Sequence, residues 1–195
     1  MKLIFIRHGE TDSNIEKRYA GSYESQLTAV GKRQGEKAAA YIKAHYEANA
    51  IFVSERERAQ YIAKRISLSY SVEERLNEYQ FGIFENMTYD EIMAIYPRAY
   101  QNWMDDRHYK IEAGESKADF EARIEGFLES VRFIEKGNIV CVTHSGVIQT
   151  AIVKLLDLPS ESKWRFAIPN GGIAVLEIQG DYARLIKLGE IEGDE

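Results

Sequence analysis

Cysteine, proline and long apolar runs are all scarce in this sequence. The single cysteine, Cys141, excludes a disulfide within the chain, and it lies in an apolar run where a buried structural thiol is expected. No apolar stretch approaches the roughly 18 residues of a membrane-spanning helix, and the first run, residues 3–6, is too short for a signal-peptide core. These absences predict a cytoplasmic protein without a membrane partner.

Positive charge is scarce as well, with 25 Lys and Arg against 31 Asp and Glu and a net charge of -6. Nucleic-acid binding through a broad basic surface requires many neutralised phosphates, so no nucleic-acid partner is expected. The composition is otherwise that of a globular protein, with 45% hydrophobic and 29% charged residues. The length suits one substantial core, and we predict a single domain over residues 1–195.

Short apolar runs alternate with helical patterns along the chain. Strands are predicted at residues 3–6, 50–54, 138–143, 173–178 and 184–188. Helices are predicted from 28 to about 48, from 54 through 66, from 88 to the proline at 97, from 116 to the glycine at 137, and from 145 to about 156. Ser54, Thr88 and Ser116 are the expected caps of three of these helices. This alternation predicts an α/β fold, a three-layer sandwich with helices on both faces of a mostly parallel sheet.

Two of the predicted strands end in a histidine. His8 follows the first strand directly after Arg7, and His144 follows the strand at 138–143. Ligands of such folds bind beyond the carboxyl ends of the strands. The fold is therefore expected to bring Arg7, His8, Arg58 and His144 together along one rim of the sheet.

This combination of side chains favours an anion over a metal ion. Two histidines beside two arginines lack further metal ligands and would repel a cation. Arginine forks match phosphate oxygens, and a helix that begins after His144 adds amide donors. The nearby positive charges should lower the pKa of His8 and keep it a neutral nucleophile. A leaving alkoxide also needs a proton, and Glu78 in "RLNEYQFGIFEN" is the candidate acid.

The stretch "IRHGETDSN" resembles the signature of the histidine phosphatase superfamily, in the branch typified by cofactor-dependent phosphoglycerate mutase. Further stretches resemble other motifs of that family in the same order along the chain: "GSYESQLTAVGKRQG", "SERERA", "LNEYQFGIFEN", "AGES" and "VTHSG". The resemblance runs from residue 2 to about residue 170.

The resemblance implies a phosphohistidine intermediate on His8, with Glu78 as the proton donor and then as the base for attacking water. It implies no metal, and no cofactor is expected. The catalytic residues it implies are His8, Glu78, Arg7, Arg58 and His144. The expected substrate contacts are Arg7, Asn14, Gly21, Arg58 and Ser145.

The sequence also departs from the family pattern. Arg56 stands where leucine is usual, Ile62 where threonine is common, and Asn86 where glycine usually follows a glutamate. Arg56 is either an additional anion contact or an exposed residue of a helical first turn, and we expect it to be exposed. Asn170 is interpreted as a turn residue near the rim.

Residues 79–115 follow the candidate acid and are rich in aromatic side chains. We expect most of these to be packing residues and the stretch to form a lid or specificity region. It enters a helix without the insertion typical of a mutase, which favours a phosphatase acting on a small phosphorylated metabolite. Phosphoglycerate mutase activity and non-catalytic phospholigand binding are the alternatives. The sequence leaves open the choice among sugar phosphates, phosphoserine, α-ribazole phosphate and nucleotide-like esters, and whether the chain forms a homodimer.

Overall fold

The computed structural model describes residues 1–191 apart from 133, 135 and 136, and it contains a six-stranded sheet in the order β3-β2-β4-β1-β5-β6. The first four strands pair in parallel, whereas β5 pairs antiparallel with both β1 and β6. The sheet is therefore mostly parallel, as predicted. The strands are β1 (Lys2–Arg7), β2 (Ala48–Val53), β3 (Ser71–Val72), β4 (Asn138–Thr143), β5 (Ile173–Gln179) and β6 (Tyr182–Gly189).

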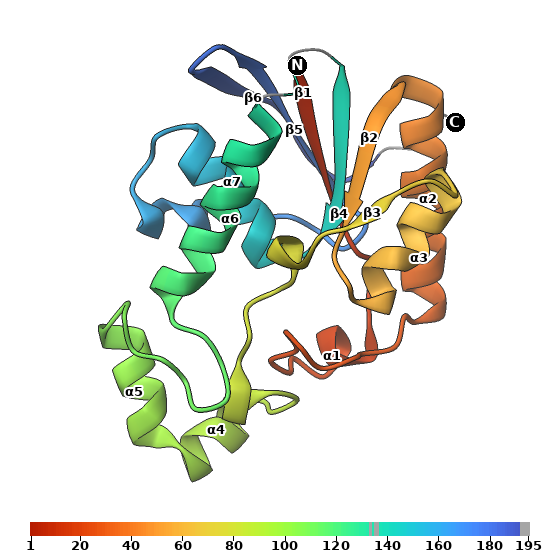
Figure 1. The fold of residues 1–195 in the computed structure, drawn as a ribbon. Helices are drawn as coiled ribbons and strands as arrows, with labels where there is room; N and C mark the ends of the chain where they lie inside the picture. Colours follow the sequence, from red (N-terminus) through yellow and green to blue (C-terminus); the bar gives the residue numbers. More distant parts are fainter. Residues whose placement is uncertain (133, 135–136, 192–195) are drawn as a thin grey trace.

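Four helices cover the two faces of this sheet (Figure 1). One face carries α2 (Ala29–His45) and α3 (Glu57–Ile66), and the other carries α6 (Lys117–Arg132) and α7 (Ser145–Leu155). The three-layer prediction is confirmed. The predicted continuation of α6 toward residue 137 includes positions 133, 135 and 136, which lie outside the described residues.

Strand β1 is buried on both faces, which explains its unbroken apolar sequence. Leu3 and Phe5 pack into the core beneath α6 and α7, whereas Ile4 and Ile6 pack into the core beneath α2 and α3. All four side chains are fully buried. Because alternate side chains of a strand point to opposite faces, a central strand between two helical layers needs no polar position until it leaves the core.

The short elements lie mainly beyond the carboxyl ends of the parallel strands, where Figure 1 shows α4 and α5. Thr88 and Glu91 form the predicted capping box of α4, and Pro97, expected only to end that helix, begins α5. The elements are α1 (Asp12–Ile15), α4 (Tyr89–Ile95), α5 (Pro97–Asp105) and the 3-10 helices at Glu74–Leu76, Gly82–Phe84 and Ser160–Arg165.

The helix-cap predictions succeed at Ser116 and fail at Ser54. The Ser116 Oγ accepts the Asp119 amide at 3.0 Å. Helix α3 instead begins at Glu57, and its N-cap, Arg56, makes no side-chain cap bond. Ser54 does not cap α3: its hydroxyl donates to Asn77 Oδ1 at 2.7 Å, and its oxygen accepts the amide of Arg56, the residue before the helix, at 3.3 Å. The S-x-x-E spacing was misleading there because a contact distant in sequence uses the hydroxyl.

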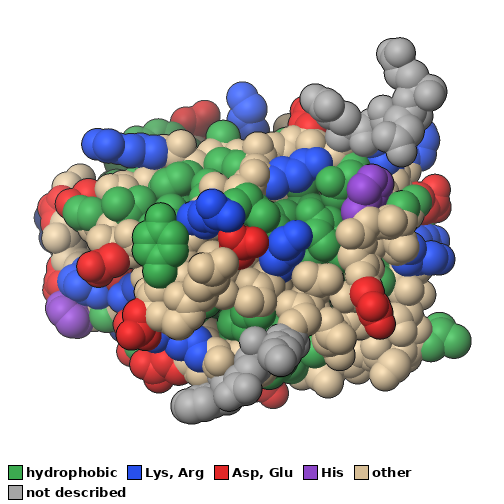
Figure 2. All heavy atoms as spheres, turned by 90° about the horizontal axis from the view of Figure 1, so that it is seen from above, with side chains coloured by type: hydrophobic (Ala, Val, Ile, Leu, Met, Phe, Trp, Pro, Cys, Tyr) green, Lys and Arg blue, Asp and Glu red, His purple; other side chains and the backbone are tan. Residues whose placement is uncertain are grey.

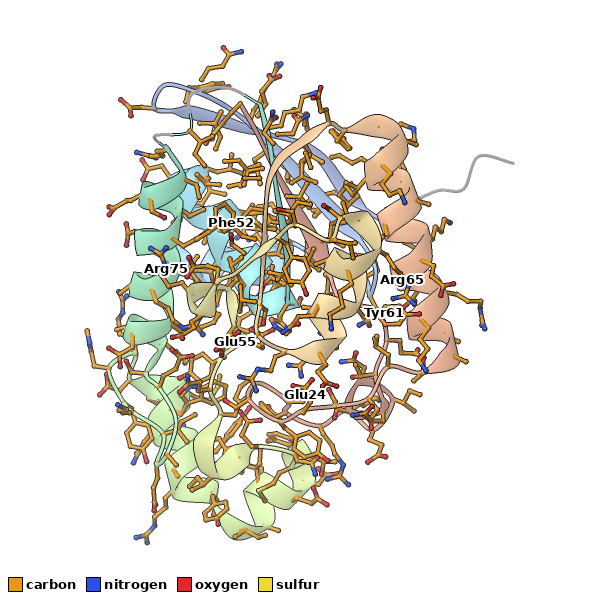
Figure 3. All side chains as sticks on the ribbon, turned by 45° about the vertical axis from the view of Figure 1, so that its right-hand side comes forward. Glu24, Phe52, Glu55, Tyr61, Arg65 and Arg75 are labelled. Carbon is orange, nitrogen blue, oxygen red and sulfur yellow. The ribbon has the colours of Figure 1, made fainter. Side chains whose placement is uncertain are left out.

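Side-chain contacts between α3 and α2 close one face of the sandwich (Figure 3). The Arg65 guanidinium lies 3.4 Å from the centre of the Tyr61 ring, and the Tyr61 hydroxyl donates to Glu36 of α2 at 2.9 Å. The first contact lies within α3 and orients the Tyr61 ring, and the hydrogen bond to Glu36 joins α3 to α2.

The end of the molecule away from α4 and α5 carries charged side chains of both signs. Figure 2 views the end at which the parallel strands begin, and basic and acidic side chains are interspersed there. Across the residues that the structure describes, no helix has both the length and the apolar character required to cross a bilayer.

A backbone contact between two glycines joins the His8 loop to α2. A Cβ atom on Gly9 would lie 2.0 Å from the Gly31 carbonyl oxygen, and one on Gly31 would lie 1.9 Å from the Glu10 carbonyl oxygen. Such distances exclude any side chain unless the backbone moves. The close approach therefore fixes the loop after β1 against the first turn of α2.

Gly31→Ala is expected to destabilise the protein by about 3 kcal/mol, because rigid backbone must move to admit the methyl group. Gly126→Ala in α6 is the matched control, since its new Cβ would meet nothing within 4 Å. That change should be neutral or stabilising by up to about 1 kcal/mol. Urea unfolding of both variants measures the difference, and equal stabilities would contradict the packing argument.

Candidate active site

The two strand-end histidines lie side by side. Strands β1 and β4 are parallel neighbours with Arg7 opposite Thr143, so the next residues, His8 and His144, leave the sheet together. Their ring centroids are 5.1 Å apart, and the residues are only 5% and 0% exposed. The predicted meeting of the two histidines at the rim is present in the structure.

One ring nitrogen of His8, Nδ1, makes a hydrogen bond, and Nε2 makes none with the residues that the structure describes. Nδ1 lies 2.7 Å from the Gly9 carbonyl oxygen, which can only accept, so the proton of the neutral ring is on Nδ1. Burial lowers the pKa of His8 well below its usual value, and the charges of Arg58 and Arg7 lower it further. The ring is therefore neutral near pH 7, with an electron pair on Nε2. That is the form of histidine that can attack an electrophile.

The tautomer of His144 is set by Ser54. The Ser54 Oγ donates to Asn77 Oδ1 at 2.7 Å and lies 2.8 Å from His144 Nε2. Because its only proton goes to Asn77, the hydroxyl accepts from His144 Nε2–H. The neutral ring then has its electron pair on Nδ1, a buried atom without a hydrogen-bond partner.

Glu55, which follows β2, fixes the direction of the hydrogen bonds that run from His144 through Ser54 to Asn77. Its amide donates to Asn77 Oδ1 at 2.9 Å, and its carboxylate accepts from Asn77 Nδ2 at 2.7 Å. Asn77 therefore cannot reverse its amide without losing both bonds. Burial, followed by the charge of Arg58, lowers the pKa of His144 well below its usual value.

Both rim arginines are held by backbone carbonyls and keep their charge available. Arg7 donates from Nη1 to the Ile168 carbonyl at 2.7 Å, and its buried Nε has no partner. Arg58 is 2% exposed and donates to three carbonyls of one loop. Those acceptors are Tyr23 at 2.8 Å, Ala20 at 3.1 Å and Gly21 at 2.8 Å.

Burial lowers the pKa of each guanidinium group; the charge of Glu78 partly opposes this for Arg7, and the charges of Glu24 and then Glu78 do so for Arg58. No carboxylate lies closer to Arg58 than Glu24, at 4.0 Å, in the part of the chain that the structure describes. A carboxylate partner would neutralise these cations, whereas neutral carbonyls leave them able to attract an anion.

Glu78 is held at the amino end of α7. Its Oε2 accepts the Gly146 amide at 3.1 Å, and its Oε1 accepts the Tyr79 amide at 3.0 Å. A Cβ on Gly146 would lie 2.5 Å from Glu78 Oε1, so a side chain at that position would displace the carboxyl group. The position of the candidate acid thus depends on the absence of a side chain at Gly146.

An ion pair that the sequence analysis missed holds the segment around Glu78. Arg123 of α6 donates to the Glu78 carbonyl at 3.0 Å and to Glu115 at 2.8 and 3.0 Å. Glu115 also accepts the Gln80 amide at 2.8 Å. Arg123 carries no local sequence signal, although Glu115 belongs to the "AGES" motif.

Glu85 organises the loop that holds Arg58. Its carboxylate accepts three successive amides, from Gly21 at 3.0 Å, Ser22 at 2.8 Å and Tyr23 at 3.0 Å. The amide of Gly21, an expected substrate contact, is therefore already engaged. Ser145, the other backbone candidate, is the first residue of α7.

Asn170 does more than form a turn. Its Nδ2 donates to Asn14 Oδ1 at 2.9 Å, and Asn14 Oδ1 also accepts the Thr11 amide at 3.1 Å. These bonds leave Nδ2 as the donor of Asn14, the residue expected to bond the transferred group. The Gly171 amide donates to the His8 carbonyl at 3.0 Å, so the same turn supports the candidate nucleophile.

The departures from the family pattern have separate outcomes. The expectation that Arg56 is exposed was wrong, because its side chain is 24% exposed and donates to the Ser22 carbonyl at 2.9 Å. It lies between Glu55 and Glu24, both labelled in Figure 3. Asn86 has φ of 60°, a left-handed conformation that asparagine tolerates, so the turn survives without glycine. Ile62 is fully buried in the core beneath α2 and α3.

A sequence model of the histidine phosphatase superfamily, branch 1, matches residues 3–191. The chain belongs to this superfamily. The match includes both histidines, both arginines and the candidate acid, so the predicted family membership is confirmed.

Similar histidine phosphatases cover nearly the whole chain. The adenosylcobalamin/alpha-ribazole phosphatase of Escherichia coli is 31% identical over 191 residues, which is 95% of this chain and 94% of the relative. Phosphoserine phosphatase 1 of Hydrogenobacter thermophilus is 28% identical over 194 residues, with 96% and 92% covered. The crystal structure of the alpha-ribazole phosphatase from Shigella flexneri superposes with a TM-score of 0.88 at 30% identity, covering 99% of this chain and 100% of that one. The protein is a phosphatase, as the sequence predicts.

Metal ligands are not clustered in the described part of this histidine phosphatase: no group of three or more His, Cys, Asp or Glu side chains could hold an ion there. The rim arginines would repel a cation in any case. The absence of a metal requirement stays a prediction.

The two buried histidines should make stability depend on pH. Because their folded pKa values are lowered, the unfolded chain binds protons below about pH 6.5 that the folded chain does not. Above that pH the two histidines should not change the free energy of unfolding with pH. Below it, the free energy of unfolding should decrease by about 1.4 kcal/mol per pH unit for each histidine as the pH falls. Urea unfolding at several pH values measures the slope. A His8→Gln, His144→Gln double variant should have a shallower slope, and equal slopes would contradict the assignment.

Proposed function

We propose that this phosphatase hydrolyses a small phosphomonoester through a phosphohistidine on His8. The observation that carries the proposal is the Gly9 contact, which places the proton on Nδ1 and leaves Nε2 as the neutral, unprotonated nitrogen. Support also comes from the rim charges, since Arg7 is half-buried, Arg58 is buried, and the carboxylate nearest to Arg58, that of Glu24, is 4.0 Å away.

In the first step, His8 Nε2 forms a bond to phosphorus while the bond from phosphorus to the ester oxygen breaks. Glu78 gives its proton to the departing oxygen, so the alcohol leaves neutral. In the second step, Glu78 takes a proton from water, the water oxygen bonds to phosphorus, and the bond from phosphorus to Nε2 breaks. Inorganic phosphate is released and His8 is again neutral.

The rim cations stabilise the negative charge of the transferred phosphoryl group throughout. Arg7 offers its unpartnered Nε, and Asn14 offers its amide nitrogen. A bound phosphate dianion also favours a proton on His144 Nδ1, the buried atom without a partner. His144 then becomes a donor to the phosphoryl group, while Ser54 retains the opposite side of the ring.

The substrate is proposed to be a small phosphorylated metabolite, and residues 79–115 are proposed to form the lid that surrounds its organic part. Relatives bear the names of an alpha-ribazole phosphatase and a phosphoserine phosphatase, which differ in the alcohol released. Those names support hydrolysis of the ester rather than mutase turnover or binding alone.

Purified protein is expected to hydrolyse p-nitrophenyl phosphate in the presence of EDTA, and His8→Ala should remove the activity. His45→Ala is the matched control, because His45 is exposed on α2 and bonds only its own helix carbonyl, that of Tyr41. This variant should retain full activity. Hydrolysis that survives His8→Ala would refute the nucleophile, and activity that requires a metal would refute the proposed mechanism.

Glu78→Gln tests the acid through the leaving group. Loss of a general acid slows a reaction by roughly 10²- to 10⁴-fold when the departing oxygen needs a proton. Hydrolysis of an alkyl phosphate should decrease by that amount, whereas p-nitrophenyl phosphate, whose phenolate leaves unprotonated, should lose much less in the first step. Rapid-quench measurement of phosphoenzyme formation isolates that step. Equal losses for both esters would exclude Glu78 as the proton donor.

A further inference from the structure

Two cavities of different character meet at Glu78. One is polar, with a volume of about 230 Å³, and its walls include Arg56, Arg75 and Arg123. The other has a volume of about 740 Å³ and borders Ser145 and Gly146 as well as Glu78. Since Glu78 is the proposed proton donor, the released alcohol must lie beside it. The alcohol therefore occupies one of these two spaces.

The larger cavity is lined by aromatic rings. Residues from five separate parts of the chain contribute them: Tyr19, Phe81, Trp103, Phe120 and Trp164. The rings of Tyr19 and Phe81 meet edge to face with centroids 5.0 Å apart. The ring centroids of Tyr79 and Trp103 are 5.7 Å apart. The Trp103 Nε1 donates to the Tyr79 hydroxyl at 2.8 Å, which fixes the indole in place. The aromatic wall is thus built from rings that hold one another in position.

Two of the cations beside this wall, Arg107 and Lys163, are paired with Glu121. Glu121 accepts Arg107 at 3.0 Å and the Ser160 hydroxyl at 3.0 Å, and Lys163 lies 3.9 Å from it. Lys117 donates to the Met104 carbonyl at 3.1 Å. Charges of both signs thus lie at the edge of the wall, with the Lys117 and Lys163 ammonium groups 5.0 and 5.3 Å from the Trp103 and Trp164 ring centres, and the continuous part of the lining is aromatic.

Trp164 stands at the mouth of the cavity and is 73% exposed. Met104, which also lines the cavity, is 50% exposed. An indole left in water beside an apolar cavity indicates a surface that a ligand covers. The cavity volume also falls within the usual range for small-molecule sites, roughly 300 to 1,000 Å³.

We propose that the aromatic cavity binds the released alcohol, that this alcohol carries an uncharged aromatic ring, and that Trp164 determines this specificity. The proposal rests on the proposed function, because it takes Glu78 as the proton donor. A small zwitterionic alcohol such as serine would leave the aromatic wall in contact with water, and the polar cavity would suit it better. An aromatic group instead buries the exposed faces of Trp164 and its neighbours.

Phosphonates test the binding without the chemistry, because their carbon–phosphorus bond is not hydrolysed by this mechanism. Phenylphosphonate and methylphosphonate would be compared as competitive inhibitors of p-nitrophenyl phosphate hydrolysis. Burying a phenyl ring should strengthen inhibition by roughly ten-fold or more over methyl. The chain has only two tryptophans, Trp103 and Trp164, and both line the cavity. Tryptophan emission should therefore change with phenylphosphonate and stay nearly constant with methylphosphonate.

Trp164→Ala should reduce the advantage of phenylphosphonate to about three-fold or less and leave inhibition by methylphosphonate unchanged. Tyr182→Ala is the matched control, since Tyr182 is a similarly exposed aromatic residue, 68% exposed, on β6 and outside the cavity. That variant should keep the full advantage. Because Trp164 is mostly exposed, its replacement leaves no buried void that would unfold the protein.

Turnover of two alkyl esters completes the test. In 2-phenylethyl phosphate and ethyl phosphate the leaving alcohols have similar acidity, so a higher kcat/KM for the phenyl ester reports binding of the ring. Faster turnover of phosphoserine than of 2-phenylethyl phosphate, or equal inhibition by the two phosphonates, would overturn the aromatic assignment. Either result could occur while His8 still hydrolyses p-nitrophenyl phosphate, in which case only this inference fails. Loss of the proposed function itself would appear as no hydrolysis of any ester.

Discussion

The binding of Arg58 by three carbonyl oxygens is the interaction on which the rest of the site depends. A buried guanidinium normally has a carboxylate partner, and that partner would cancel its charge. Here the carboxylates lie further out: Glu24 is 4.0 Å from the guanidinium, and Glu85 binds the amides of the same loop. The loop is held from both sides, and the cation keeps its attraction for an anion. The lowered pKa values of both histidines follow partly from this arrangement.

The sequence predicts the sheet, its helical layers and the meeting of two histidines because these depend on local patterns. Continuous apolar runs identify buried strands, and the strand-end rule places His8 and His144 on one rim. The parts it could not predict are contacts between distant segments. Nothing near Ser54 shows that its hydroxyl faces Asn77 instead of α3, and Arg123 reaches Glu78 only once α6 has packed. The capping-box rule succeeded at Thr88, which has no such competing partner.

Two parts of the structure serve different purposes. The ends of β1 and β4 carry His8 and His144, whose side chains are buried and hydrogen-bonded. The helix α5, by contrast, has no buried residue, although its Trp103 contacts Tyr79 and Phe81. Segments with little burial change sequence and shape at low cost. This division fits a family whose members share a fold and a reaction while their names specify different alcohols.

Gly146 has a consequence for comparing relatives of this protein. Its missing side chain is the space that the Glu78 carboxyl group occupies. A homologue with a larger residue there must turn this carboxyl group aside, and because the group is the end of a flexible side chain, it can do so without moving the backbone. The residue at this one position therefore decides where the carboxyl group opposite it can lie, although it belongs to a different segment of the chain.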